Sequence, residues 1–174
     1  MSTANTGFLV AFIDVKRENL YQKKSKFHHV RKNSYPCIHL NNLLNAMITE
    51  VSAGVFISVD TKYEMILSHP LNQNFVFSYA ICLENRNDFS IQLLRRHWFI
   101  YDSCGIHREI EGPGVVGEQP VLLPGEKFSY RSACDLRTER GKMKGFYTMQ
   151  TIGNKGFFNV RIPEFSLETP YSRN

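Results

Sequence analysis

Three glycines in one short segment have the spacing of a phosphate-binding motif. They are Gly112, Gly114 and Gly117 in the run Gly-Pro-Gly-Val-Val-Gly, which fits the pattern G-x-G-x-x-G. In dinucleotide-binding proteins such glycines let the backbone approach a pyrophosphate, and the helix that follows presents its N-terminal N–H groups to the anion. The chemistry open to this segment is therefore phosphate or nucleotide binding, provided that a strand precedes the glycines and a helix follows them.

The residues around the glycines argue against such a helix. Pro120 and Pro124 each lack a backbone N–H and interrupt helical hydrogen bonding. Glu118 places a negative charge where a phosphate would lie, and Pro113 removes a donor from between the first two glycines. The segment after Gly117 is therefore not predicted to form the phosphate-binding helix of a dinucleotide fold.

Two other roles for the segment stay open. Backbone N–H groups of a glycine-rich turn can bind an anion without a helix, aided here by the basic residues 95–97 or Arg108. Alternatively, the segment is a structural turn or a rigid loop that recognises a protein partner, and we favour this interpretation because the motif alone is weakly informative. A structural turn would pack Val115, Val116, Val121 and Leu122 inward. The candidate recognition or anion-binding residues are Gly112, Gly114, Val115, Val116, Gly117, Glu118, Gln119 and Pro120.

No other pattern predicts a catalytic or metal site. The six histidines contain no H-x-x-x-H pair and the four cysteines no C-x-x-C pair. A weak alternative is a transition-metal site where His97 and His107 flank a turn that contains Cys104. The sequence also has no G-x-S-x-G nucleophile elbow. We therefore predict a protein that is not an enzyme and that has no metal and no cofactor.

The charge distribution separates the N-terminal segment from the rest of the 174 residues. Residues 1–50 carry seven basic and three acidic side chains, whereas residues 51–174 carry 14 basic and 13 acidic ones. A nearly neutral body is not typical of a nucleic-acid-binding domain. No apolar run approaches the roughly 18 residues of a membrane span. The four cysteines, with no secretory signal before them, favour reduced thiols in a cytoplasmic protein.

The first 46 residues read as a basic extension of a domain that occupies residues 47–174. The stretch from Tyr21 to Tyr35 is basic and has no regular hydrophobic period. Such stretches are most often solvated tails, so we expect this extension to be poorly ordered. A bolder hypothesis makes Met47 the native start of the protein, in which case residues 1–46 are not part of the native product. The intact mass of the native protein would test this hypothesis.

From residue 51 the chain alternates in the manner of β-strands separated by turns. Trp98 lies in one of these strands, where we expect it to be buried between two sheets. On that strand Leu94, Trp98 and Ile100 are predicted to share one face, with Arg95, His97 and Tyr101 on the other. The seven expected strands are residues 54–64, 74–85, 89–103, 106–112, 125–134, 141–152 and 155–165. About seven short strands without a long amphipathic helix predict an all-β antiparallel sandwich of the fibronectin type III or immunoglobulin kind.

Several motifs in order along this region resemble the ApaG family. They are Arg96-His97-Trp98, the loop Gly112–Pro120, Pro124-Gly125-Glu126 before Phe128-x-Tyr130-x-Ser132, Gly141-x-Met143-x-Gly145-x-Tyr147-x-Met149, and Ile162-Pro163-x-Phe165. The resemblance covers about residues 49–170, and residues 1–46 have no counterpart in the usual bacterial form. It implies a fibronectin type III-like sandwich, in agreement with the strand pattern.

The resemblance implies little about function. Bacterial members are associated with cobalt and magnesium resistance, and similar domains in eukaryotic F-box and polymerase-delta-interacting proteins look like interaction modules. We therefore expect a non-enzymatic module that binds an unidentified protein partner, with no nucleic-acid or membrane partner. The alternative is a phosphate- or nucleotide-binding protein that uses the segment Gly112–Gly117. Edge strands of a sandwich also make a homodimer possible.

Overall fold

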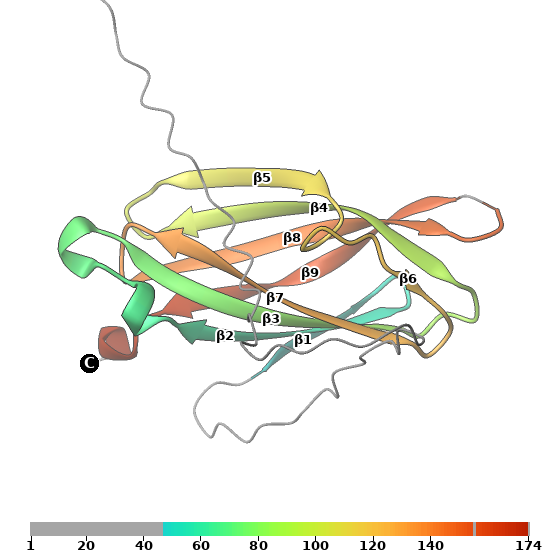
Figure 1. Ribbon diagram of the computed structural model, residues 1–174, viewed down its shortest axis with the longest axis horizontal. Helices are drawn as coiled ribbons and strands as arrows, with labels where there is room; N and C mark the ends of the chain where they lie inside the picture. Colours follow the sequence, from blue (N-terminus) through green and yellow to red (C-terminus); the bar gives the residue numbers. More distant parts are fainter. Residues whose placement is uncertain (1–46, 155, 174) are drawn as a thin grey trace, which may run out of the picture.

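Residues 47–154 and 156–173, which the computed structural model describes, form two antiparallel β-sheets packed face to face (Figure 1). The first sheet has the order β1 (Ile48–Ser52), β2 (Val55–Tyr63), β3 (Phe75–Asn85), β7 (Lys127–Leu136). The second has the order β5 (His107–Pro113), β4 (Ile91–Asp102), β8 (Arg140–Thr151), β9 (Phe157–Glu168), with β6 (Val121–Leu122) also paired to β4. Three short 3-10 turns complete it: η1 (Met65–Leu67), η2 (Pro70–Asn72) and η3 (Pro170–Arg173).

The prediction of an all-β antiparallel sandwich is confirmed. Each of the seven expected segments forms a strand, and the structure adds the short strands β1 and β6. β6 was not apparent in the sequence because it has only two residues and lies between Pro120 and Pro124. The predictions of an extension over residues 1–46 and of a start at Met47 concern a segment outside the described residues. No helix in the described part of the chain is both long and apolar enough to cross a membrane.

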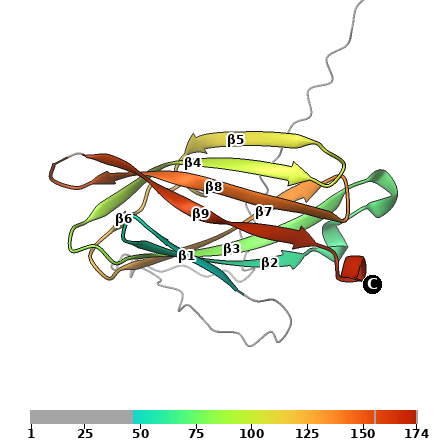
Figure 2. The same ribbon diagram turned by 180° about the vertical axis from the view of Figure 1, so that it is seen from behind.

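The core between the sheets follows the alternation of each strand. Every second residue of β3 points inward, and Trp98 of β4 faces them from the other sheet with 1% of its surface exposed. Its ring lies 5.5 Å from that of Tyr79, 6.4 Å from that of Tyr147 and 6.0 Å from that of Phe165. The predicted position of Trp98 between two sheets is therefore confirmed. The two sheets are seen from the opposite side in Figure 2.

β4 contains an irregularity that the sequence did not predict. Leu93 pairs with Met149 and Arg95 with Thr148, so Leu94 is an extra residue, a β-bulge. Leu93 is fully buried, whereas Leu94 is only partly buried. The bulge therefore brings Leu93, which the sequence did not assign to the inner face, into the core together with Trp98, because it shifts the alternation of the strand at this point.

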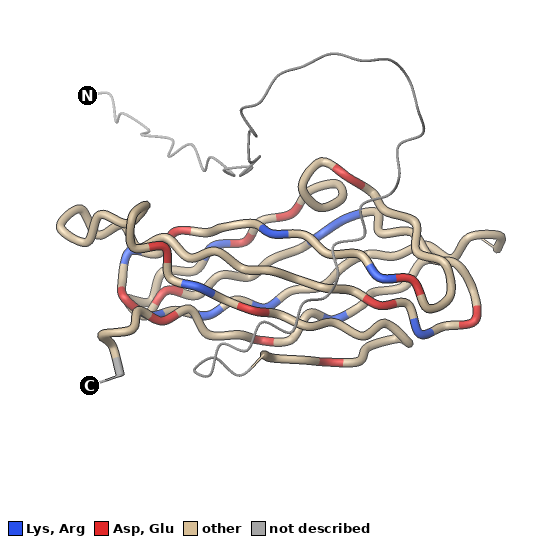
Figure 3. The backbone as a smooth tube through the Cα atoms, turned by 60° about the horizontal axis from the view of Figure 1, so that its bottom comes forward, with Lys and Arg blue, Asp and Glu red and all other residues tan. Residues whose placement is uncertain are grey.

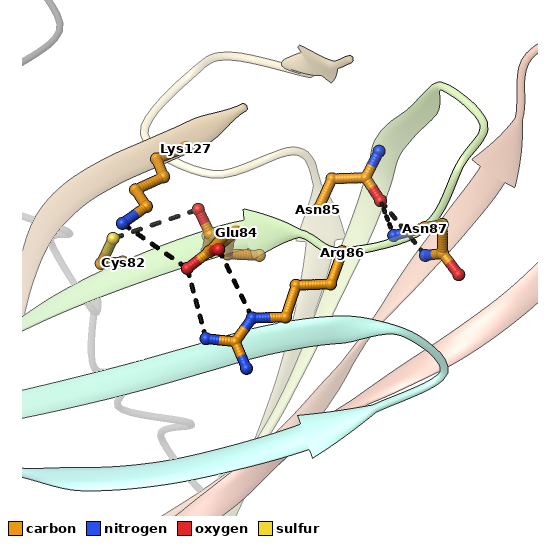
Figure 4. Close-up of polar contacts among 7 residues, drawn as sticks. Cys82, Glu84, Asn85, Arg86, Asn87 and Lys127 are labelled. Carbon is orange, nitrogen blue, oxygen red and sulfur yellow. Dashed lines mark hydrogen bonds and ion pairs between the residues drawn. The ribbon is translucent and has the colours of Figure 1, made fainter. Parts of the chain in front are cut away.

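Charged residues of both signs are distributed over the two sheets (Figure 3). One group lies on the outer face of the first sheet, where Glu84 forms ion pairs with Arg86 at 3.4 Å and Lys127 at 3.5 Å (Figure 4). The hydrogen bond from Arg86 and the charge of Lys127 lower the pKa of Glu84. Ion pairs as exposed as these contribute at most about 1 kcal/mol each, so they do not determine the fold.

Asn85, next to Glu84, has a larger structural role. It is fully buried, and its Nδ2 donates to the carbonyl oxygens of Phe89 at 2.8 Å and Leu122 at 3.1 Å. Its Oδ1 accepts hydrogen bonds at 3.1 Å from the backbone N and from the side chain of Asn87 (Figure 4). The side chain of Asn85 therefore joins the turn between β3 and β4 to strand β6. This contact fixes the end of the β5–β6 loop.

We expect Asn85→Ala to lower the free energy of unfolding by about 2 kcal/mol, because it leaves the buried Leu122 carbonyl without this donor. Urea unfolding at neutral pH measures the change. The control is Asn72→Ala, at an exposed position of η2, where a change within about 0.5 kcal/mol is expected. Equal losses in the two variants would contradict the role given to Asn85.

Candidate functional site

All eight candidate residues lie at the connection between β5 and β6. Gly112 and Pro113 end β5, and residues 114–120 form a tight loop that leads to β6. Val115 inside this loop is buried, with 1% of its surface exposed, whereas Val116 is 41% exposed. Of the four residues expected to pack inward, Val115 and Leu122 do so, and Val116 and Val121 are exposed.

The centre of the loop is a two-residue hairpin. The backbone N of Val115 donates to the carbonyl of Glu118 at 2.8 Å, and the N of Glu118 donates to the carbonyl of Val115 at 2.9 Å. The two residues between them, Val116 and Gly117, have positive φ values of 49° and 77°. Positive φ at both central residues is the signature of the type I′ turn, whose usual sequence is Asn-Gly.

Gly114 is required by a close backbone approach. Its φ is 55°, and a Cβ atom at this position would lie 2.1 Å from the carbonyl oxygen of Glu118. A side chain here would collide with rigid backbone and would also disfavour the left-handed conformation. Gly117, in contrast, would meet nothing within 4 Å and needs only its positive φ. The two glycines therefore serve the turn for different reasons.

The loop is fixed to the bulge of β4. The carbonyl of Leu94 accepts a hydrogen bond from the N of Gly114 at 2.8 Å and another from Nε2 of Gln119 at 2.7 Å. Gln92 donates from its side chain to the carbonyl of Gln119 at 3.2 Å. The loop is therefore held at both ends by one short stretch of one strand.

Arg96 holds the loop from the side of the core. Its Nη1 donates to the carbonyl oxygens of Pro113 at 3.0 Å and Gly114 at 2.8 Å. The Cα of Gly112 faces the same guanidinium group, to which a Cβ would lie 3.5 Å away. Of the cations named as possible anion ligands, Arg96 is the one at the loop, whereas Arg95 pairs with Glu111 and Arg108 with Asp135.

These contacts use the groups that an anion would need. The N–H groups of Gly114, Val115 and Glu118 all donate to backbone carbonyls of the protein. The Nη1 of Arg96 is directed at carbonyl oxygens, and the segment after Gly117 leads to the strand β6. The arrangement therefore differs from a phosphate-binding loop, in which several N–H groups converge on the ligand.

A cluster of tyrosines lies beside Arg96 in the core. The hydroxyl groups of Tyr130 and Tyr147 are hydrogen bonded to each other; Tyr147 is fully buried and Tyr130 is partly buried against the core. Burial raises the pKa of Tyr79, Tyr130 and Tyr147 above the ordinary tyrosine value, and the charge of Arg96 only partly opposes this rise. The three groups stay protonated and neutral at physiological pH.

Comparison with known proteins identifies the family. The family model described as ApaG domain matches residues 66–151. A protein named Protein ApaG from Methylorubrum extorquens is 43% identical over 120 residues, which cover 69% of this chain and 92% of the relative. Another from Rhodospirillum centenum is 43% identical over 128 residues, covering 74% and 98%. The chain belongs to the ApaG family.

A solved ApaG-like structure agrees with this assignment. The crystal structure of the putative ApaA protein from Bordetella pertussis superimposes with a TM-score of 0.65 at 39% sequence identity. The alignment covers 68% of this chain and 95% of the Bordetella protein. The recognition of the family from its ordered motifs is therefore confirmed.

The structure of this ApaG chain does not bring together the histidines of the alternative transition-metal site. His97 lies opposite Glu111 and His107 opposite Tyr101, so the two histidines are separated along the β4–β5 pair. Within residues 47–154 and 156–173 there is no group of three or more histidine, cysteine, aspartate or glutamate side chains that could hold a metal ion. His97 instead stacks on Phe99 and Phe146 and is hydrogen bonded to Glu109.

We expect Gly114→Ala to destabilise the protein by at least about 2 kcal/mol, because the new Cβ meets the Glu118 carbonyl in a strained backbone conformation. Gly117→Asn is the matched control, since asparagine tolerates a positive φ and the position is open. Its expected change is below about 1 kcal/mol. Denaturant unfolding of both variants measures the difference. Equal stability of the two variants would show that the hairpin does not have this geometry.

We expect stability to fall as the pH rises from about 9 to 12. Burial raises the pKa of Cys134 from 9.0 to about 12 and holds the three tyrosines above their ordinary value of 10.0, so the unfolded chain loses these protons first. Each such group then removes about 1.4 kcal/mol of stability per pH unit. Urea unfolding at a series of alkaline pH values measures the slope, which Tyr130→Phe should reduce. Normal tyrosinate titration of all tyrosines in the folded protein would contradict the prediction.

Proposed function

We propose that this ApaG chain is a non-enzymatic cytoplasmic recognition module that contacts a protein partner through the hairpin tip at Val116. The observation that carries the proposal is the conformation of Val116: a β-branched apolar residue, 41% exposed, at a φ of 49°. Valine is among the residues least suited to positive φ. An exposed position in such a turn would be better filled by asparagine or glycine.

The left-handed backbone conformation of Val116 is energetically costly. A non-glycine residue held in the left-handed region costs on the order of 1 to 3 kcal/mol, and such residues gather at functional sites. The exposed part of the Val116 side chain recovers little of this cost by burial within the chain. Contact with a partner supplies a reason for an apolar side chain at this position.

The surroundings of Val116 suit recognition. Gly114 and Gln119 are tied to β4, and Arg96 holds the loop from the side of the core. A loop already fixed in one conformation loses little entropy when it binds. Leu123, which follows in the chain, is a further exposed apolar side chain, at 54%.

The loop offers little for catalysis. Between Gly112 and Pro120 the only ionisable side chain is that of Glu118, which is exposed. A hydrolase or transferase needs a nucleophile with a base beside it, or a bound metal. This supports a binding role, and any influence of the protein on cobalt or magnesium resistance would then act through the partner.

We expect Val116→Asn to raise the free energy of unfolding by about 1 kcal/mol and to abolish partner binding. The gain follows because Asn-Gly is the preferred type I′ pair, and the loss because the apolar contact is removed. Binding is measured by affinity capture from native lysate with quantitative mass spectrometry, and stability by urea unfolding. The control is Leu71→Asn, which changes a fully exposed apolar residue of η2 and should leave the captured partner unchanged.

Two results would count against the proposal. The first is a partner that stays bound to Val116→Asn at wild-type levels. The second is saturable heat on calorimetric titration with inorganic pyrophosphate or ATP that disappears in Arg96→Gln, since this would favour phosphate binding at Gly112–Gly117. We expect flat titrations, because the N–H groups of Gly114, Val115 and Glu118 already donate to backbone carbonyls.

A further inference from the structure

The outer face of the second sheet carries an ordered set of side chains that no described element covers. Strand pairing places residues of β5 or β6, β4, β8 and β9 side by side in rows across this face (Figure 2). Phe157 in one such row is 68% exposed, and His97 in another stacks on Phe99 and contacts Phe146 at a tilt. An aromatic and partly apolar sheet face of this kind is typical of a surface that packs against another layer.

In three of these rows, the side chains at one end complement the side chains at the other end, so that each row complements its own reverse. The row at the β6 end reads apolar, amide, amide, apolar: Val121, Gln92, Gln150, Phe157. The central row reads acidic, aromatic, aromatic, basic: Glu111, His97, Phe146, Arg161. The last row places Tyr101 beside Lys142, which lies 5.7 Å from the centre of that ring.

We propose that this face binds a second copy of the same chain, packed sheet to sheet about a two-fold axis that runs parallel to the strands between β4 and β8. Such an axis places each row over its own reverse, so that β4 lies over β8 of the second copy and β5 over β9. Glu111 then meets Arg161 of the second copy, and His97 meets Phe146. At the β6 end Val121 meets Phe157, and Gln92 meets Gln150.

Charge complementarity selects a second copy over an unrelated partner. The acids Glu109 and Glu111 lie on the β5 side of the face. The β9 side carries the base Arg161 together with Glu164, whose charge is paired with Lys142 of β8 at 3.0 Å. A two-fold axis between β4 and β8 superimposes Glu111 and Arg161, which have opposite signs, at both ends of the central row, whereas an axis perpendicular to the sheet would not bring the faces together. Opposite charges that meet at both ends of this row fix the register of the two copies and favour the dimer.

The side chains concerned can reach these contacts. Within the chain Arg161 pairs with Glu50 and Glu111 with Arg95, but the Arg161 and Glu111 side chains are 73% and 61% exposed. Pairs this exposed are worth at most about 1 kcal/mol, so exchanging partners costs little. Four strands about 4.8 Å apart and roughly ten residues long give a face on the order of 20 by 30 Å. This approaches the roughly 800 Å² that each partner buries in a standard interface.

The first experiment measures the mass of the full chain in solution by sedimentation velocity over a range of concentrations. We expect a dimer, and we expect Phe157→Asp to weaken its association at least tenfold. Leu71→Asp is the matched control, because it introduces the same charge at a fully exposed apolar residue of η2, which is outside the face. It should leave the dimer intact, and circular dichroism should show both variants folded.

The second experiment uses charge reversal and does not depend on the stability of either variant alone. Glu111→Arg places like charges together in its own homodimer, and Arg161→Glu does the same. Each variant should therefore be mainly monomeric. Mixed in equal amounts they should form a heterodimer, because both contacts between the two different chains are then oppositely charged.

The outcomes separate the proposal from its alternatives. A wild-type chain that stays monomeric at all concentrations would overturn it. A dimer that survives Phe157→Asp but is lost in Leu71→Asp would place the contact at η1 and η2 and would also overturn it. Failure of the mixed charge-reversed chains to associate would exclude the two-fold axis proposed here. None of these results depends on whether Val116 binds a partner.

Discussion

The extra residue in β4 at Leu94 is the constraint on which the candidate site depends. The bulge reverses the alternation of the strand, so that Leu93 at one end and Trp98 at the other both point into the core. Beyond the bulge the alternation is regular, so Arg96 has the same orientation as Trp98, toward the tyrosines and beneath the loop. The carbonyl of Leu94 is left to accept the N–H of Gly114 and the side chain of Gln119. One irregular residue therefore both completes the core and fixes the hairpin.

The strands were predictable because alternation with a period of two is a direct consequence of strand geometry. The inward set of β3 and the buried Trp98 follow from it, and the structure places them as expected. The bulge was not predictable, because Leu93 and Leu94 are both leucine and either can be read as the inward residue. The short strand β6 was missed for a related reason: two residues contain no period, and they form a strand only because β4 is there to pair with them.

In the loop, too, some features follow from the local sequence and others from contacts with residues distant in the chain. Pro120 and Pro124 exclude a helix after Gly117 by covalent geometry, which can be read from the sequence. The exposure of Val116 cannot, because statistics for single residues place valine inward and at negative φ. Its conformation is imposed by the hydrogen bonds that close the hairpin and by Arg96, which is distant in the chain. Residue propensities therefore predicted the wrong conformation and the wrong exposure for Val116, the strained residue to which we assign a role. Such a mismatch is expected where function competes with stability.

The two proposed surfaces are compatible with each other and together suggest how the module would act. A two-fold axis parallel to the strands keeps the direction of every strand, so both hairpins of the dimer lie at the same end of the assembly. A partner with two equivalent sites could then engage both Val116 side chains at once. Linking two weak contacts in this way raises the overall affinity by a factor of roughly 10² to 10⁴ without a new interaction. A small rigid tip is therefore sufficient for recognition when the outer sheet face supplies the second copy.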